Sequence, residues 1–344
     1  MRGLSTRPLL TATVVLGLVG LFTPAAQAHH WQLESATLPA PFLRDGRLEF
    51  GIEPSGVAPI GDGRRVLVAH DEAASLYVVD VATGALVGAP LVLPKFPPTT
   101  KSGPKWEGMA LDSGGNYYLV GSCSGPSDEE WAASGAVVRF RLRGGETPAI
   151  DDTSVVRCDI GRSLEAALRA QRLDDAQVAK RKVGELAIRE LGGGRQLVIG
   201  LSGPDDKVRA FAADITAPPS PDAALELRPM FSFDAGRCEG IAAQLTSLEY
   251  VPAMSGFLVL TATEDADHAF HGNTLWLVAD GETRRARSYA TFEVAMKAAG
   301  LAVLGVEASG HLTRIKLLIT YDNDPHATKI PSRFQTATLV HERS

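Results

Sequence analysis

An internal repeat constrains the fold of this chain more than any other feature of its sequence. An acidic residue beside a glycine or another small residue, one or two apolar residues, a turn and an apolar β run recur five times along the chain. The acidic residues of the five copies are Glu53, Glu107, Glu185, Glu239 and Glu307. Each copy continues into another strand-like segment after a short polar turn. Repetition of this kind is typical of folds in which neighbouring units bury one another's apolar faces.

The repeat predicts an all-β fold, a β-propeller with five blades. A single blade cannot bury both faces of its sheet, whereas radial packing does so and leaves only short, protected edges. The glutamates are further apart than the ~40–50 residues of an ordinary blade, so we expect insertions, and a sixth blade inside the long second unit is an alternative. Residues 31–38 are expected to supply the outer strand that the last unit lacks, which closes the ring. An array of β-sandwiches is the competing architecture.

Two segments have helical patterns. Residues 163–181 are rich in Ala, Leu and Arg, and Leu164 and Leu168 follow a helical period, which predicts a helical insertion in one blade. A second, short helix is predicted over residues 292–299, with Gly300 at its C-terminal end.

Residues 1–28 have the parts of a secretory signal peptide. Arg2 and Arg7 precede an apolar run over residues 9–22, and a small-residue cleavage motif follows. A membrane anchor is the alternative, but a spanning helix needs ~20 apolar residues. We therefore expect an exported protein, periplasmic or secreted, whose mature part is one domain over residues 29–344. No later stretch is apolar enough to span a membrane, and a net charge of -6 disfavours binding to nucleic acid.

The cysteines do not form a metal-binding motif. Cys123, Cys158 and Cys238 are far apart in the sequence, and the chain has no C-x-x-C pair, so a thiolate zinc site is not expected. Export permits one disulfide, but the spacing does not show which two cysteines would form it.

The predicted ring gathers carboxylates at one end of its channel. If each acidic segment begins an innermost strand that pairs antiparallel with the next β run, the start of one strand lies beside the end of the other. The repeat glutamates then lie near acidic residues that follow the second strands, namely Asp71, Glu72, Asp205, Asp206, Glu264, Asp265, Asp322 and Asp324. The basic residues close to these positions are Lys105, Lys182, Lys207, Arg237 and Arg333.

So many carboxylates repel one another unless cations neutralise them. Basic side chains are one source of positive charge, and a hard cation bound by carboxylate and carbonyl oxygens, for which calcium fits best, is the other. The densest group of oxygen ligands is Asp322-Asn323-Asp324, which lacks the spacing of an EF-hand loop. The alternative is that the acidic residues are solvated turn residues with structural hydrogen bonds.

Several motifs resemble a known group of proteins. They are Glu-Gly-Met-Ala (107–110), Glu-Gly-Ile-Ala (239–242), Val-Ile-Gly-Leu-Ser-Gly-Pro (198–204), and Tyr-Asp-Asn-Asp (321–324) followed by Pro-Ser-Arg-Phe (331–334). Over residues 50–340 the chain resembles an uncharacterised bacterial β-propeller family that is similar to the phytase-like and esterase-like propellers. The resemblance implies a calcium-supported phosphoester hydrolase.

The resemblance also implies roles for particular residues. The implied calcium ligands are Glu107, Glu239, Glu307, Asp322 and Asp324, and the first four are also the implied catalytic residues. The implied phosphate-binding residues are Lys105, Arg237 and Arg333. The chain departs from the pattern at Gly184-Glu185, where the order of Glu and Gly is reversed, and at Ala308, which follows Glu307. Ser202 stands where the related pattern tends to have a basic residue.

Two functions are compatible with these features. The first is an exported hydrolase of phosphoester or other ester bonds, in which a calcium-bound water attacks the substrate. The second is a non-catalytic propeller that binds a small molecule or a cell-envelope ligand at the channel mouth. The chain has no G-x-S-x-G elbow, P-loop or dinucleotide-binding motif. We expect a monomer with no metal other than calcium.

Overall fold

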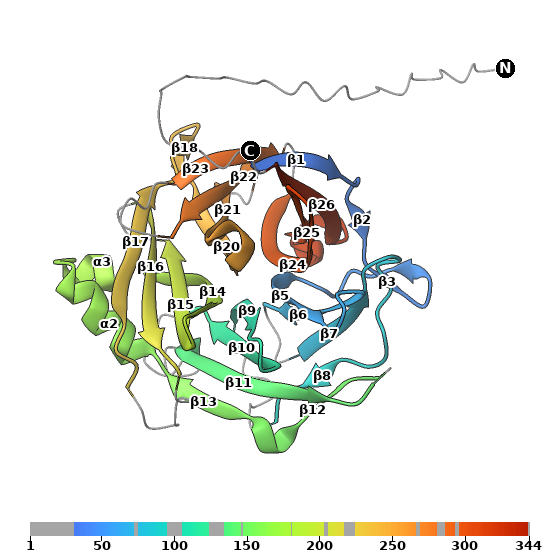
Figure 1. Cartoon of the computed structure of the whole chain (residues 1–344), viewed down its shortest axis with the longest axis horizontal. Helices are drawn as coiled ribbons and strands as arrows, with labels where there is room; N and C mark the ends of the chain where they lie inside the picture. The colour runs from blue at the N-terminus through green and yellow to red at the C-terminus, as the bar shows by residue number, and fades with distance from the viewer. Residues whose placement is uncertain are drawn as a thin grey trace.

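The protein's structure is a computed structural model, and Figure 1 shows it down the axis of a ring of sheets. It describes residues 31–71, 75–94, 105–123, 134–145, 147–179, 181–202, 206–216, 224–265, 269–280, 286–292 and 296–342. The predicted signal peptide, residues 1–28, lies outside the described residues.

Five antiparallel sheets surround a central channel, which confirms the five-bladed, all-β prediction (Figure 1). Blade one contains β5 (Pro54–Ile60), β6 (Arg65–His70), β7 (Ser75–Asp80) and β8 (Leu91–Val92). Blade two contains β9 (Trp106–Leu111), β10 (Asn116–Gly121), β11 (Ala136–Arg143), β12 (Ala149–Ile150) and β13 (Val156–Asp159). Blade three contains β14 (Lys182–Leu191), β15 (Gly194–Ser202), β16 (Lys207–Asp214) and β17 (Arg228–Asp234). Blade four contains β20 (Gln244–Val251), β21 (Gly256–Glu264), β22 (Phe270–Ala279) and β23 (Ala286–Phe292).

Blade five joins the two ends of the described chain. Its strands are β24 (Lys297–Ser309), β25 (Leu312–Asp322), β26 (Arg333–Glu342), β1 (Trp31–Ala36) and β2 (Ala40–Pro41). β1 pairs antiparallel with β26, with Trp31 opposite His341 and their rings stacked 5.0 Å apart. The predicted closure of the ring by the N-terminal strand is therefore confirmed.

The core is divided among the contacts between neighbouring blades. Five apolar clusters fill these contacts, one for each neighbouring pair around the ring. Because each blade is covered on both faces, the second strands are continuous apolar runs rather than alternating ones. All six residues of β10 are buried, as are Val66 to His70 in β6.

The predicted helical insertion is confirmed as α2 (Gly161–Ala170) and α3 (Asp175–Ala179), with Lys180 outside the described residues. α2 buries Leu164, Ala167 and Leu168 against the core between blades two and three, as the helical period requires. The remaining short elements are β3 (Leu43–Arg44), β4 (Arg47–Leu48), η1 (Asp152–Ser154), β18 (Arg237–Cys238), β19 (Ile241–Ala242), η2 (Pro252–Met254) and α4 (Pro325–Thr328). None of the helices among the described residues is long and apolar enough to cross a membrane.

The helix predicted over residues 292–299 is wrong. β23 ends at Phe292, β24 begins at Lys297, and residues 293–295 lie outside the described residues. The Ala-rich segment forms the innermost strand of blade five because Gly300 packs against blade one, where a Cβ would come within 2.4 Å of the Ser55 carbonyl oxygen. Tertiary packing of this kind overrides helix propensity.

The three cysteines form no disulfide in the structure. Cys123 and Cys158 are buried, and Cys238 is partly exposed. Burial raises the pKa of the Cys123 thiol to about 12, so it stays protonated and unreactive at neutral pH.

Candidate functional site

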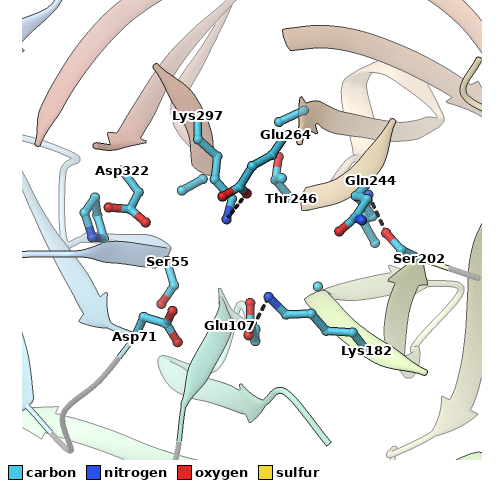
Figure 2. Close-up of a pocket in the computed structure, with 15 residues that line it drawn as sticks. Ser55, Asp71, Glu107, Lys182, Ser202, Gln244, Thr246, Glu264, Lys297 and Asp322 are labelled. Carbon is cyan, nitrogen blue, oxygen red and sulfur yellow. Dashed lines mark hydrogen bonds and ion pairs between the residues drawn. The ribbon is translucent and has the colours of Figure 1, made fainter. Parts of the chain in front are cut away.

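A pocket lies at one end of the central channel, and all five blades line it (Figure 2). Its space of about 620 Å³ includes part of the open solvent at the mouth. Its lining comes from the first residues of the innermost strands and from the last residues of the second strands. The sequence predicts this meeting of strand ends, and both kinds of strand end line the pocket in blades one, three, four and five, whereas blade two contributes only the start of its innermost strand.

A β-bulge in each innermost strand shapes the pocket. In all five strands the pairing with the second strand shifts register close to the strand's first residue. The residues at the five shifts are Ser55, Glu107, Gly184, Thr246 and Ala299, and every one of them lines the pocket. Bulges re-aim side chains and are frequent beside active sites. The same local irregularity thus supplies one lining residue from each blade.

Glu107 and Lys182 form an ion pair between blades two and three. The Lys182 Nζ lies 3.1 Å from the Glu107 Oε1, and only 12% of the Glu107 side chain is exposed. Burial raises the pKa of Glu107 to about 7; the charge of Lys182 acts against this rise, and the charge of Asp71 adds to it. The charge of Glu107 in turn raises the pKa of Lys182. Glu107 is therefore about half protonated at neutral pH, as a group that exchanges protons should be.

Asp322 and Asp71 bring two further carboxylates into the pocket from neighbouring blades. Burial raises the pKa of Asp322 to about 6, and the negative charge of Asp71 contributes to that rise. The Asp71 Oδ1 is shielded from solvent and has no hydrogen-bond partner among the described residues. Across the pocket, Lys297 lies with its Nζ 3.0 Å from the Glu264 Oε2. The site thus holds four carboxyl groups and two ammonium groups.

The uncharged part of the lining includes polar side chains as well as apolar ones such as Leu245 and Ala262. Ser202 and Gln244 lie side by side where blades three and four meet, and Thr246 lies beside Glu264 on blade four (Figure 2). The Ser202 Oγ accepts a hydrogen bond of 2.7 Å from the Leu245 backbone N–H, which fastens the two blades. A ligand in this pocket would meet carboxylates and ammonium groups together with hydroxyl and amide groups.

Only two of the predicted carboxylate ligands reach the pocket. Glu107 and Asp322 line it, but Glu239 and Glu307 do not. The prediction that Glu239 and Glu307 begin innermost strands is wrong, since those strands begin at Gln244 and Lys297.

The two misplaced glutamates occupy other parts of the fold. Glu239 lies in the turn between β18 and β19 with a φ of 52°, is 72% exposed, and contacts the His271 Nδ1 at 3.2 Å. Glu307 lies near the far end of β24, where its Oε1 is 2.7 Å from the Lys316 Nζ. Both carboxylates are thus paired outside the pocket.

The other predicted site residues also lie outside the lining. Lys105 is exposed just before β9. Arg237, on the β18–β19 hairpin, forms an ion pair with Asp206, which lies just before β16. Arg333 donates to the Pro39 carbonyl oxygen at 3.4 Å. Asp324 donates its backbone N–H to the Asp322 Oδ1 at 2.9 Å, so it orients a pocket residue without lining the pocket itself.

Sequence reasoning missed several lining residues, of which Lys297 matters most. It was assigned to a helix, so its place beside Glu264 was not foreseen. The uncharged members Ser55, Gln244 and Thr246 carry no chemical signal in the sequence. The one signal that finds Ser55 and Thr246 is their alignment with Glu107 in the repeat, two positions before the apolar residue that Met109 represents, and this signal does not reach Gln244.

The predicted calcium ligands do not come together as a set. Within the part of the chain that the structure describes, no three His, Cys, Asp or Glu side chains are close enough to share a metal ion. Two of the pocket carboxylates face lysines instead. The lysines therefore supply positive charge that the calcium hypothesis assigned to the ion.

The buried carboxyl groups predict how stability depends on pH. Burial also raises the pKa of Glu249, in β20, to about 8. A carboxyl whose pKa is higher in the folded than in the unfolded state binds more protons when folded, so stability falls as pH rises between the two values. We expect the midpoint temperature of thermal unfolding to decrease as pH rises from 4.5 to about 8, which are the ordinary and the raised pKa values of Glu249.

Calorimetry of Glu249→Gln, with Glu307→Gln as control, checks this prediction. One pKa unit corresponds to ~1.4 kcal/mol. Removing the Glu249 carboxyl should therefore abolish a few kcal/mol of the decline in unfolding free energy with rising pH. Glu307→Gln should leave the decline in place, because Lys316 lowers the pKa of the exposed Glu307. A midpoint that rises over this interval in the unmodified protein would contradict the burial argument.

Comparison with known proteins finds only distant structural similarities. No family model and no curated protein matches the sequence. The structure is similar to a calcium-binding protein, regucalcin, from Agrobacterium tumefaciens, with a TM-score of 0.41 and 10% identity over 85% of this chain and 92% of that one. It is also similar to a streptogramin B lyase, with a TM-score of 0.37 and 8% identity over 85% of this chain and 95% of that one.

A third similar structure is an exo-β-1,3-galactanase from Phanerochaete chrysosporium, with a TM-score of 0.48 and 8% identity over 88% of this chain and 64% of that one. At such identities the similarity concerns the fold alone. The chain is a five-bladed β-propeller that distantly matches propellers of several functions.

Proposed function

We propose that this protein is a hydrolase of ester bonds in a small polar substrate, with phosphoesters as the first class to test, and that its active site is the pocket at the channel mouth. The observation that carries the proposal is Glu107, a buried carboxyl whose pKa is about 7 and whose oxygen faces the Lys182 ammonium in a pocket. Carboxyl groups tuned by burial to near neutrality serve as general acids in many enzymes.

The proposed reaction uses residues of this chain only. Glu107, when protonated, donates its proton to the oxygen of the leaving alcohol as the ester bond breaks. Asp71, whose Oδ1 has no partner among the described residues, accepts a proton from the attacking water. Water and ester thus give an alcohol and an acid, and the proton from water restores the pair of carboxyl groups.

Lys182 and Lys297 suit the developing negative charge. Both ammonium groups point into the pocket, and fixed positive groups stabilise oxygens that gain charge in the transition state (Figure 2). Protonation of Glu107 and Asp322 removes two negative charges from a pocket that also holds the two lysines. An anionic substrate such as a phosphoester should therefore bind more tightly as pH falls through about 7 and about 6.

Calcium has no step in this mechanism. The ligand set implied by the family resemblance is dispersed over the fold, since Glu239 and Glu307 are paired elsewhere. The donor set around the pocket does not fit the implied site, and the reaction is derived without it.

The proposal includes the protein's setting. The pattern of residues 1–28 supports export to the periplasm or beyond, and an open mouth on a closed ring suits a monomer that meets a small molecule or a cell-envelope component from solution.

A second candidate is a propeller that binds its ligand without turnover. It is favoured by the two lysine–glutamate pairs, because groups that already neutralise one another are suited to a stable binding surface. This candidate predicts saturable binding at the mouth with no product.

A hydrolysis screen separates the two candidates. The mature protein should hydrolyse at least one member of a panel of phosphoesters and carboxylic esters, in the presence of either calcium or a chelator. Asp71→Asn should lower the rate, and Gly305→Ala, at an open position, should not. Saturable binding without product would favour the binding propeller, and activity that disappears with the chelator would reinstate a metal-assisted reaction.

A further inference from the structure

One ring of positions lies directly beneath the pocket. The residues that come next in sequence after Ser55, Glu107, Gly184, Thr246 and Ala299 are Gly56, Gly108, Glu185, Ser247 and Gly300. The glycines allow close approach between blades, since a Cβ on Gly56 would come within 2.4 Å of the Met109 backbone nitrogen. Of these five residues Glu185 alone has a large side chain, which occupies the space that a Cβ at Gly108 would take.

Gly108 makes room for the Glu185 carboxyl. A Cβ at Gly108 would come within 1.8 Å of the Glu185 Oε1 and 2.7 Å of its Cα. Only 1% of Glu185 is exposed. The carboxyl group thus lies between blades two and three, one residue below Glu107 and Gly184 in the lining.

The Glu185 carboxyl is hydrogen-bonded to several blades. The Leu186 backbone N–H donates to its Oε1 at 2.9 Å, and the Ser247 hydroxyl donates to an oxygen of the same carboxyl, Oε2, at 2.9 Å. The Met109 backbone N–H also donates to the carboxyl. The Ser247 Oγ in turn accepts from the Leu301 backbone N–H at 2.9 Å. One connected network therefore joins β9, β14, β20 and β24.

These four strands contribute most of the residues that line the pocket. Met109 is two residues after Glu107, Glu185 is three after Lys182, and Leu301 is four after Lys297. The three hydrogen bonds to the carboxyl act against the effect of burial, which raises the pKa of Glu185. An apolar residue in this place would leave the Met109 and Leu186 backbone donors without their buried acceptor, which is costly.

We propose that Glu185 is a positioning residue of the mouth pocket, whose carboxyl clamps the bulges of four blades and so holds Glu107 against Lys182. It touches no substrate in this role and acts through Glu107. The inference deepens the proposed function and rests on it, but its physical part concerns the environment of Glu107 and is measurable without a substrate.

The test compares Glu185→Leu with Glu185→Gln in the full mature protein. In a ¹³C NMR titration of glutamate carboxyls, Glu185→Leu should lower the Glu107 midpoint from about 7 towards 4.5, because loosened blades admit water. Glu185→Gln keeps an acceptor for the backbone donors and should restore most of the midpoint. With an active substrate, Glu185→Leu should lower kcat up to ~10²-fold through misplacement of the acid, with a smaller change in KM.

A second variant decides the matter if Glu185→Leu does not fold. Ser247→Ala removes the link between Glu185 and Leu301 and should shift the Glu107 midpoint in the same direction. Glu307→Gln, an exposed glutamate paired with Lys316 outside the pocket and the network, is the control. A folded Glu185→Leu or Ser247→Ala protein whose Glu107 midpoint stays at the value of the unmodified protein would overturn the inference. If the Glu107 midpoint shifts as expected in these variants but the unmodified protein hydrolyses no substrate, the inference about Glu185 holds and only the proposed hydrolysis is refuted.

Discussion

Replacing Glu107 by glutamine is expected to lower kcat/KM for ester hydrolysis by ~10²–10⁴-fold, the usual contribution of a general acid. Glutamine has nearly the same shape but no acidic proton, so the leaving alcohol would have to depart as an alkoxide. The unmodified protein should lose activity as pH rises through about 7, the pKa of Glu107, because only the protonated carboxyl donates. Glu107→Gln should lack this limb of the pH profile.

Glu307→Gln is the matched control for this variant. Glu307 is also a glutamate paired with a lysine, at 2.7 Å, but it lies outside the mouth pocket and is exposed. Its replacement should leave both rate and pH profile unchanged. Equal losses of activity in both variants would mean that the reaction does not take place in the mouth pocket. An unchanged rate in Glu107→Gln would mean that Glu107 is not the general acid.

Gly56→Ala is expected to destabilise the ring strongly, by ~3 kcal/mol or more, at the upper end of the penalties for overpacking. The added Cβ would lie 2.4 Å from the Met109 nitrogen and 2.5 Å from the Gly108 carbonyl carbon, both of them backbone atoms. A flexible side chain could move aside, but backbone in the innermost strand of the next blade cannot move without disturbing the bulges. Denaturant unfolding of the two proteins measures the difference.

Gly305→Ala provides the comparison for Gly56→Ala. Gly305 lies in the innermost strand of blade five, and a Cβ there meets nothing within 4 Å. The unfolding free energy of the Gly305→Ala protein should change little or rise slightly, because alanine restricts the conformations of the unfolded chain. Similar losses at both positions would show that the effect comes from strand propensity rather than from contact between blades.

The sequence predicted the number of blades because the second strands are unambiguous. Runs such as β10 are apolar at almost every position, since they are covered on both faces, and each run marks one blade. The innermost strands were harder to find. The Glu-Gly pair at 239–240 looks like the pair at 107–108, but both of its residues have positive φ angles and form a hairpin turn. Identity of side chains was therefore a poor guide to structural equivalence.

Aligning the repeat copies on a different triplet of residues identifies the innermost strands, and with them more of the residues that line the pocket. The small residue, apolar residue and alanine at 56–58, 108–110 and 300–302 recur as Gly-Val-Ala, Gly-Met-Ala and Gly-Leu-Ala, and Glu-Leu-Ala at 185–187 follows the same pattern. This pattern reflects the contact between blades, which is the physical constraint, whereas the acidic residue varies. Blade four has Ser-Leu-Glu at 247–249, so its innermost strand lacks even this signal.

Some features of the pocket depend on distant residues and were beyond prediction. The pKa of Glu107 follows from burial among five blades and from Lys182, which is far away in the sequence. Spacing along one chain does not reveal which lysine faces which carboxylate. Asp322 was identified because it ends a second strand, a position that the antiparallel pairing places at the mouth.

The most direct test of the account is a ¹³C NMR titration of the Glu107 carboxyl in the mature protein, assigned by its absence in Glu107→Gln. It needs no substrate and reports the property on which the proposed chemistry depends. We predict a midpoint of about 7, held there by burial against the opposing charge of Lys182. A midpoint near the ordinary value of 4.5 would mean an ionised, solvated carboxylate, and the mouth pocket would then have no general acid at neutral pH.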